Sequence, residues 1–109
     1  MDNLLIAINS ARFDNGLSAL QLDDCLTQQA QNHADKMART GRMNHNGFSE
    51  RLQNCSKNMG SENVAAGQSN ATECVSAWIN STGHNKNMMG KWSVCGVGEK
   101  NRYWCAIFS

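Results

Sequence analysis

Two histidines stand in segments where metal binding or proton transfer could take place. His45 is followed by Asn46 and Gly47, and His84 is preceded by Gly83 and followed by Asn85. Because glycine and asparagine favour turns, we predict that both histidines lie on loops and are accessible to solvent or a ligand. A neutral imidazole can ligate a metal and can also act as a general acid or base. The pair therefore predicts a two-histidine site.

Glu62 is the carboxylate that could complete this site. It stands just before a small apolar run that enters the core, residues 64–66. A carboxylate in that position must be exposed or paired, because burying an unpaired charge is costly. Placed beside two neutral imidazoles, it would make a divalent-metal or proton-transfer site. The alternative is an ordinary surface carboxylate.

The third histidine, His33, has a different setting. It falls within a stripe at helical spacing formed by Leu26, Ala30 and Met37. A histidine on such a stripe is expected at the edge of the core with a hydrogen-bond partner. We therefore exclude His33 from the candidate site.

Helical patterns precede both candidate histidines. Apolar residues recur at helical spacing from Leu4 to Ala11, and the pattern ends at Asn15-Gly16. A longer helix is predicted from Asp23-Asp24, which suit the positive end of a helix dipole, to Gly41. The polar stretch 42–60 predicts a loop that can contain a short helix.

A third helix and, after it, a pair of strands are predicted in the C-terminal half of the chain. Residues 70–73 have the form of a capping box, so a third helix is expected through Ile79. Residues 92–108 alternate around the polar turn Glu99 to Arg102, which predicts a hairpin. Helices followed by paired strands indicate an α+β domain, and 109 residues correspond to a single domain, 1–109.

Charge and hydropathy argue against nucleic-acid binding and against a membrane-spanning segment. The formal net charge is +1, without a basic stripe, so nucleic acid is not an expected partner. The longest apolar run, Leu4 to Ile8, is far shorter than the roughly 20 residues of a membrane span. We therefore expect no transmembrane segment.

Cysteine content favours an extracellular location. Five cysteines occur in 109 residues, and none forms a CxxC pair of the redox or metal-binding kind. Three triplets of the glycosylation type, which begin at Asn54, Asn70 and Asn80, agree with secretion. The sequence therefore predicts a secreted protein.

Several segments, in order, resemble the CAP superfamily, which includes plant pathogenesis-related proteins, venom allergens and cysteine-rich secretory proteins. They are residues 30–34 (AQNHA), His45 with Gly47-Phe48, residues 61–65 (SENVA), residues 78–88 (WINSTGHNKNM) and residues 95–98 (CGVG). The block 78–88 is the most specific. The resemblance covers almost the whole chain, is nearest to the compact bacterial-type members, and implies a three-layer α-β-α sandwich with a small antiparallel sheet.

The resemblance also implies a site. In this family two histidines and two glutamates lie at the floor of a central cleft, and several members bind zinc or another divalent cation. His45, Glu62 and His84 match three of these four positions, whereas Ser81 stands where many members have the second glutamate. With one carboxylate fewer, we expect weaker metal affinity than in the four-residue sites.

One disulfide is implied in the same way. Cysteines at positions corresponding to Cys95 and Cys105 are bridged in several relatives, so we expect a bridge between them. Cys25, Cys55 and Cys74 remain, and these three can form at most one further pair. The sequence does not assign that pair.

Three functions compete at this point. The first, favoured by the family, is an extracellular binding domain without turnover that takes a divalent cation, with a lipid, a sterol or an extracellular protein as a further partner. The second is a zinc-dependent hydrolase in which His45 and His84 hold the metal and Glu62 takes a proton from bound water. The third is an interaction protein in which the histidine cleft only stabilises the fold.

Overall fold

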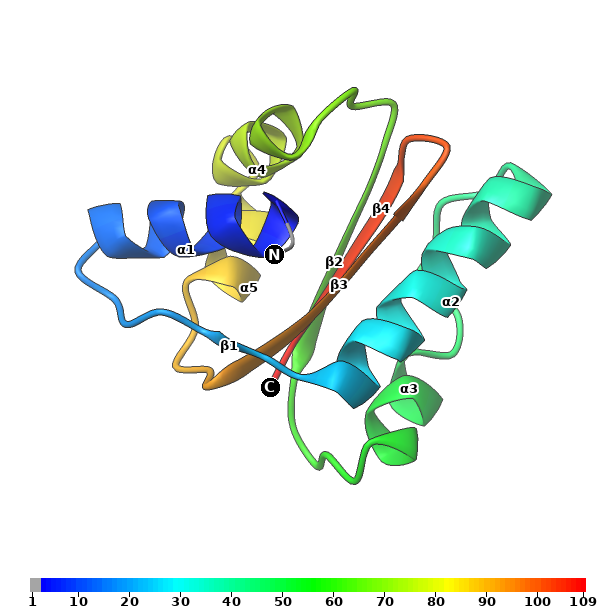
Figure 1. Cartoon of the computed structure of the whole chain (residues 1–109), viewed down its shortest axis with the longest axis horizontal. Coiled ribbons are helices and arrows are strands. Elements are labelled where there is room, and N and C mark those ends of the chain that lie inside the picture. The colour runs from blue at the N-terminus through cyan, green and yellow to red at the C-terminus, as the bar shows by residue number, and fades with distance from the viewer. Residues whose placement is uncertain (1–2) are drawn as a thin grey trace.

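A four-stranded sheet separates two groups of helices in the computed structural model, which describes residues 3–109 (Figure 1). One face carries α1 (Asn3–Asp14), α4 (Ala71–Ile79) and α5 (Thr82–Met88), and the other carries α2 (Asp24–Thr40) and α3 (Phe48–Asn54). The strands are β1 (Gln21–Leu22), β2 (Ser61–Ala66), β3 (Val94–Lys100) and β4 (Tyr103–Phe108). The α+β class and the α-β-α layering predicted from the sequence are confirmed.

The sheet has the strand order β1-β3-β4-β2. The predicted hairpin is β3 and β4, which pair antiparallel and turn at Asn101 and Arg102, both with positive φ as a tight hairpin turn requires. β2 pairs antiparallel with β4 and forms one edge of the sheet. At the opposite edge the two residues of β1 pair parallel with β3, and the other two strand pairings are antiparallel, as predicted for the small sheet.

Helix α2 lies directly on β3 because β3 has glycine where the two backbones meet. A Cβ on Gly96 would lie 2.1 Å from the carbonyl carbon of Leu26, and a Cβ on Gly98 would lie 2.5 Å from Cα of Gln31. Neither position has room for a side chain. The glycines of the CGVG segment therefore fix the distance between α2 and the sheet.

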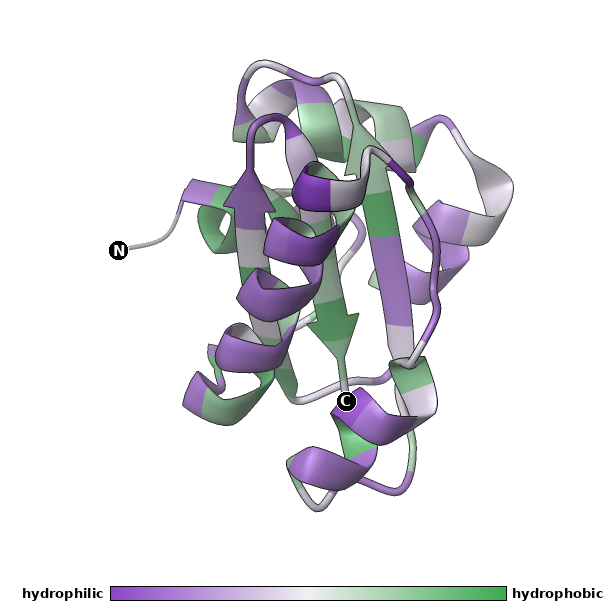
Figure 2. Cartoon of the chain, turned by 90° about the vertical axis from the view of Figure 1, so that its right-hand side faces the viewer, coloured by the Kyte–Doolittle hydropathy of each residue, from purple (hydrophilic) through white to green (hydrophobic). Residues whose placement is uncertain are grey.

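Each face of the sheet has its own core. On the α2 side the buried residues of α2 pack on Val64, Cys105 and Ile107, while the outer surface of α2 is hydrophilic (Figure 2). On the other side α1, α4 and α5 bury a larger cluster around Trp78, which is 1% exposed. Two cores back to back hold the sheet between them.

The helix ends follow the predicted caps. The side chain of Asp23 accepts a hydrogen bond from the backbone N–H of Leu26, and α2 ends at Gly41, which has φ +67°. Asn70 accepts from the backbone N–H of Glu73 at 2.9 Å. The carboxylate of Glu73 bonds Ser69 rather than the cap residue, so the capping box is only half formed.

The predicted bridge between Cys95 and Cys105 is wrong. In the hairpin register Cys95 is opposite Phe108, and Cys105 is opposite Gly98. A shift of three residues is roughly 10 Å along a strand, beyond the Cα separation that a disulfide allows. The side chains also point to opposite faces, since Cys95 belongs to the Trp78 core and Cys105 to the α2 core. Both remain buried thiols.

The disulfide joins Cys25 to Cys55, a pair that the sequence left open, and Cys74 is a buried thiol. This bond ties the start of α2 to the residue that ends α3. It closes a separation of 30 residues, which contains the whole of the loop that carries His45. The bond therefore restricts the segment on which one side of the candidate site stands.

Replacing both cysteines, Cys25→Ser with Cys55→Ser, is expected to lower the free energy of unfolding by about 2–4 kcal/mol, because the unfolded chain regains the freedom of a long loop. Urea unfolding followed by circular dichroism measures the change. Dithiothreitol should lower the wild-type midpoint to the same extent and leave the double variant unchanged. An equal midpoint for wild type and variant would contradict the structural role of this bond.

Candidate functional site

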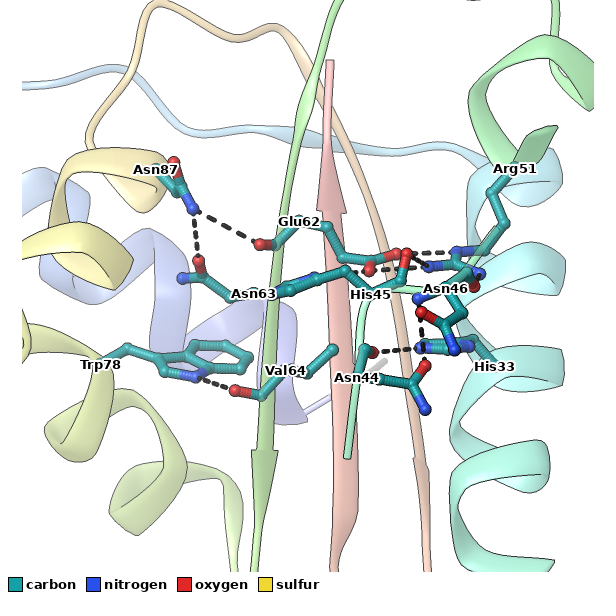
Figure 3. A network of polar contacts seen from close by, with 10 residues as sticks. All are labelled: His33, Asn44, His45, Asn46, Arg51, Glu62, Asn63, Val64, Trp78 and Asn87. Carbon is teal, nitrogen blue, oxygen red and sulfur yellow. Dashed lines mark hydrogen bonds and ion pairs between the residues drawn. The ribbon is translucent and has the colours of Figure 1, made fainter. Parts of the chain in front are cut away.

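Glu62 is the centre of a buried polar cluster between β2 and α3 (Figure 3). Its side chain is 1% exposed. Oε1 accepts from Nδ1 of His45 at 2.8 Å and from Nη2 of Arg51 at 2.7 Å, and Oε2 accepts from Nε of Arg51 at 2.7 Å. Glu62 is thus a paired carboxylate, and the surface alternative considered above does not hold. Two-point pairing with a guanidinium is the geometry in which a buried carboxylate is most stable.

Arg51 is the functional residue that the sequence analysis missed. It comes from α3, is 8% exposed, and also donates from Nη1 to the carbonyl of Asn46 at 2.7 Å and from Nη2 to the carbonyl of His45 at 3.3 Å. One guanidinium therefore holds the buried carboxylate and the backbone of the histidine loop together. A seven-residue helix with two buried residues has too little pattern to single out this arginine.

His45 lies on a loop, as predicted, and its side chain is 52% exposed. In the neutral form of the ring, donation from Nδ1 to Glu62 leaves the lone pair on the second ring nitrogen, Nε2. The loop is fixed on its other side by His33, whose Nε2 donates to the carbonyl of Asn44 at 2.7 Å. His33 is 4% exposed, in line with the core-edge role that we predicted. Its burial lowers its pKa.

His84 is not on a loop, in contrast to the prediction, but in the first turn of α5. Its Nδ1 is hydrogen-bonded to Oγ of Ser81 at 2.9 Å, so the residue that stands in place of the family glutamate contacts the histidine directly. Desolvation lowers the pKa of His84, and the charge of His45 lowers it further. Met43, two residues before His45, lines one cavity together with His84, so the His45 loop passes beside α5.

Two residues of β2 make hydrogen bonds to the two histidines, one on each face of the sheet. Its side chains alternate, so Glu62 points toward α3 while Asn63 points toward α5 (Figure 3). Nδ2 of Asn63 donates to the carbonyl of His84 at 2.9 Å, and Asn63 is fully buried. Two consecutive residues of one strand thus position the two histidines, which come from different layers.

The outer edge of β2 is covered by side chains. Trp78 Nε1 donates to the carbonyl of Val64 at 3.1 Å, and Asn87 Nδ2 donates to that of Glu62 at 3.4 Å. Beside His84 this edge also lines a cavity of about 240 Å³. Its walls are Met43, Val64, Ala65, Ala66, Gln68, Ala77, Trp78, Ser81 and His84.

Glu62 has no oxygen left free for a metal ion. Both oxygens of Glu62 are engaged by Arg51, and one also by His45. Within residues 3–109, no three or more side chains of His, Cys, Asp or Glu are grouped so that they could hold a metal ion. Among the predicted site residues, the imidazoles of His45 and His84 are therefore the side chains whose second ring nitrogen is not engaged by Glu62 or Ser81.

Known proteins share this arrangement of strands and helices. The model of the cysteine-rich secretory protein family, also called CAP, matches residues 5–103. This chain belongs to that family. An uncharacterised protein of Bacillus subtilis, YkwD, is 30% identical over 92% of this chain and 43% of its own length. The chain thus spans less than half of that relative.

Solved structures of other proteins have the same fold as this chain. An extracellular protein of Bacillus anthracis with an SCP domain superposes with a TM-score of 0.89 and 25% identity over 96% of this chain, which spans 38% of that protein. An outer surface protein of Borrelia burgdorferi, 22% identical, covers 96% of this chain and 87% of its own, with a TM-score of 0.84. The chain is a CAP domain of the compact bacterial type. No helix in residues 3–109 is long and apolar enough to cross a membrane.

Removing the guanidinium should destabilise the domain sharply. Arg51→Leu leaves Glu62 buried without its bidentate partner, so we expect a loss of about 3–5 kcal/mol in the free energy of unfolding. Arg51→Leu combined with Glu62→Gln should recover more than half, because the uncompensated charge is then absent. Urea unfolding gives both values.

Arg39→Leu serves as the matched control for this pair. Arg39 is exposed on the last turn of α2, and its replacement should change stability by no more than about 0.5 kcal/mol. If Arg51→Leu lowers the free energy of unfolding as little as Arg39→Leu does, the buried pair of Arg51 and Glu62 does not stabilise the domain.

Proposed function

We propose that this chain is a secreted binding domain that holds a metal cation at His45 and His84 and does not catalyse a reaction. The observation that carries the proposal is the way both rings are fixed. Each Nδ1 is bonded to an oxygen of the protein, Oε1 of Glu62 or Oγ of Ser81. A hydroxyl can accept from an imidazole N–H, so both rings can present an unprotonated Nε2 to a metal.

Secretion is supported by the relatives and by the disulfide. Two structural neighbours are described as an extracellular protein and an outer surface protein. The Cys25–Cys55 bond has Cys25 exposed, and such bonds persist in oxidising compartments outside the cytoplasm.

A binding role is favoured over hydrolysis by the state of Glu62. A zinc hydrolase of the kind considered above needs this carboxylate to take a proton from metal-bound water. In the fold it is 1% exposed and held by two hydrogen bonds from Arg51. Its oxygens are closed to solvent and occupied by Arg51 and His45, so the carboxylate is not placed to reach metal-bound water, which argues against the hydrolase alternative.

A zinc titration tests the cation site. At pH 7.5 wild type should bind one equivalent, and His45→Ala and His84→Ala should each abolish measurable binding, because a single imidazole is left. Lys86→Ala, an exposed change on the same helix as His84, should bind like wild type. Isothermal titration calorimetry measures the zinc affinity and stoichiometry of all four proteins.

The pH dependence supplies the second readout. Protons compete with the metal for the imidazoles, so affinity should fall by about tenfold or more between pH 7.5 and pH 5. Because the pKa of His84 lies below its ordinary value, this ring is neutral at pH 7.5. Wild type that binds no zinc at pH 7.5, or variants that bind like wild type, would overturn the proposed function.

A lipid is the second candidate ligand, and one observation favours it. A groove of about 500 Å³ runs between α1 and α4, with Ile6, Val75 and Ile79 among its walls. Mostly apolar concave sites of this size suit acyl chains. A fluorescent fatty acid should bind wild type and lose at least about tenfold in affinity in Ile79→Asp. Absence of fatty-acid binding to wild type would remove this candidate.

An extracellular protein partner stays a prediction.

A further inference from the structure

The outer edge of β2 carries backbone groups that the sheet does not use. The N–H of Gly67 donates to the carbonyl of Arg102 at 2.7 Å, directly after the last residue of the β2–β4 register. Antiparallel strands bond their partner through every second residue, so the N–H groups of Val64 and Ala66 point away from β4. In residues 3–109 no strand lies beyond β2. These two N–H groups are therefore left without a partner strand.

The carbonyl groups on this edge already have partners. The side chain of Asn87 donates to the carbonyl of Glu62. The indole of Trp78 donates to that of Val64 (Figure 3). Val64 is 4% exposed, which leaves its backbone N–H little access to water. Because a buried N–H without an acceptor is costly, the edge favours a ligand that brings hydrogen-bond acceptors.

Gln68 adds an unpaired acceptor at the same place. It follows β2 by two residues and is a wall of the 240 Å³ cavity, as are Val64 and Ala66. Its Oε1 is buried and has no hydrogen-bond partner within residues 3–109. A peptide group carries both a carbonyl acceptor and an N–H donor, whereas an acyl chain carries neither and a metal ion cannot accept a hydrogen bond. The polar groups of this cavity therefore match a peptide.

Charge and size narrow the choice of peptide. None of the residues described as walls of the cavity is Asp, Glu, Lys or Arg, and the lowered pKa of His84 keeps that ring neutral at pH 7.5. Small or apolar side chains make up most of the remaining wall, among them Ala65, Ala77 and Trp78. At about 240 Å³ the cavity is smaller than the roughly 300–1,000 Å³ of most small-molecule sites. It suits a few residues of extended chain with small uncharged side chains.

We propose that the edge of β2 from Val64 to Ala66 binds a short extended peptide segment of an extracellular partner protein, which joins the sheet as a further strand. Carbonyl oxygens of the peptide accept from the N–H groups of Val64 and Ala66. Its side chains alternate between the Met43 side and the His84 side of this edge. The inference goes beyond the proposed function and does not use the cation, so zinc binding and peptide binding can fail separately.

Two-dimensional ¹H–¹⁵N NMR with acetyl-Ala-Val-Ala-amide as the probe tests the pairing. The amide proton resonances of Val64 and Ala66 should move downfield in a saturable way, because both groups gain a hydrogen bond. Their hydrogen exchange should slow by about fivefold or more. The amides of Asn63 and Ala65 face β4, so they are the internal control and should keep their exchange rates.

A backbone substitution supplies the second readout. Ala66→Pro removes one of the two donors at an exposed position of an edge strand, where proline is tolerated. It should lower the affinity for the probe by about tenfold, whereas the matched control Ala66→Ser keeps the N–H and should bind within about twofold of wild type. A depsipeptide probe, in which an ester replaces the central amide, lacks an N–H donor and should bind wild type about tenfold more weakly. This last measurement needs no change in the protein.

The outcomes separate a peptide from other occupants of the edge. Resonances of Val64 and Ala66 that do not move in wild type, or equal binding by Ala66→Pro and Ala66→Ser, would overturn the inference. If the two N–H groups become protected as the protein concentration rises without the probe, a second copy of the chain occupies the edge, and the partner inference is wrong. Shifts confined to Val64, Ala66 and the cavity walls, together with weaker binding in Ala66→Pro, support it.

Discussion

The buried pair of Glu62 and Arg51 is the interaction on which the rest of the site depends. A carboxylate with 1% of its side chain exposed is tolerated only when its charge is compensated and its lone pairs are occupied. Two hydrogen bonds from the guanidinium supply the compensation, and Nδ1 of His45 occupies a further acceptor position on Oε1. The orientation of the exposed imidazole is thus a consequence of how a buried charge is stabilised.

The disulfide and the backbone contacts around the site hold in place the helices that carry its residues. Arg51 must come from α3, a helix of seven residues that is too short to be stable alone. The Cys25–Cys55 bond fixes the end of α3 to α2, and the glycines of β3 fix α2 to the sheet. On the other face, Arg12 donates to the carbonyl of Met88 at 2.8 Å and so holds the end of the helix that carries His84.

Much of this fold could be predicted from the sequence, and the parts that could not share a physical cause. The ends of α2 and the start of α4 follow from local capping by Asp23, Gly41 and Asn70, and the hairpin from alternation around a polar turn. These signals are local. α5 was missed because Thr82–Met88 is polar, with Met88 as its only buried residue, so its helical form depends on packing against α4 and β2.

Long-range contacts were the other source of error. Nothing near Arg51 in sequence shows that a carboxylate eleven residues away will be its partner. The Cys95–Cys105 expectation failed because a shift of three residues in register places the two thiols on opposite faces, which spacing alone does not reveal. His45, Glu62 and His84 were found together through family resemblance, and the structure supplies Arg51, which makes the carboxylate a support for the imidazole rather than a metal ligand.

The most direct test of this account is the protonation state of the His45 ring, read by long-range ¹H–¹⁵N NMR at pH 7.5. The account predicts a protonated Nδ1 and an unprotonated Nε2 in wild type, and a loss of that preference in Glu62→Gln. A proton on Nε2 of His45 in wild type, or a ring unaffected by Glu62→Gln, would contradict the claim that the buried carboxylate sets the imidazole for binding.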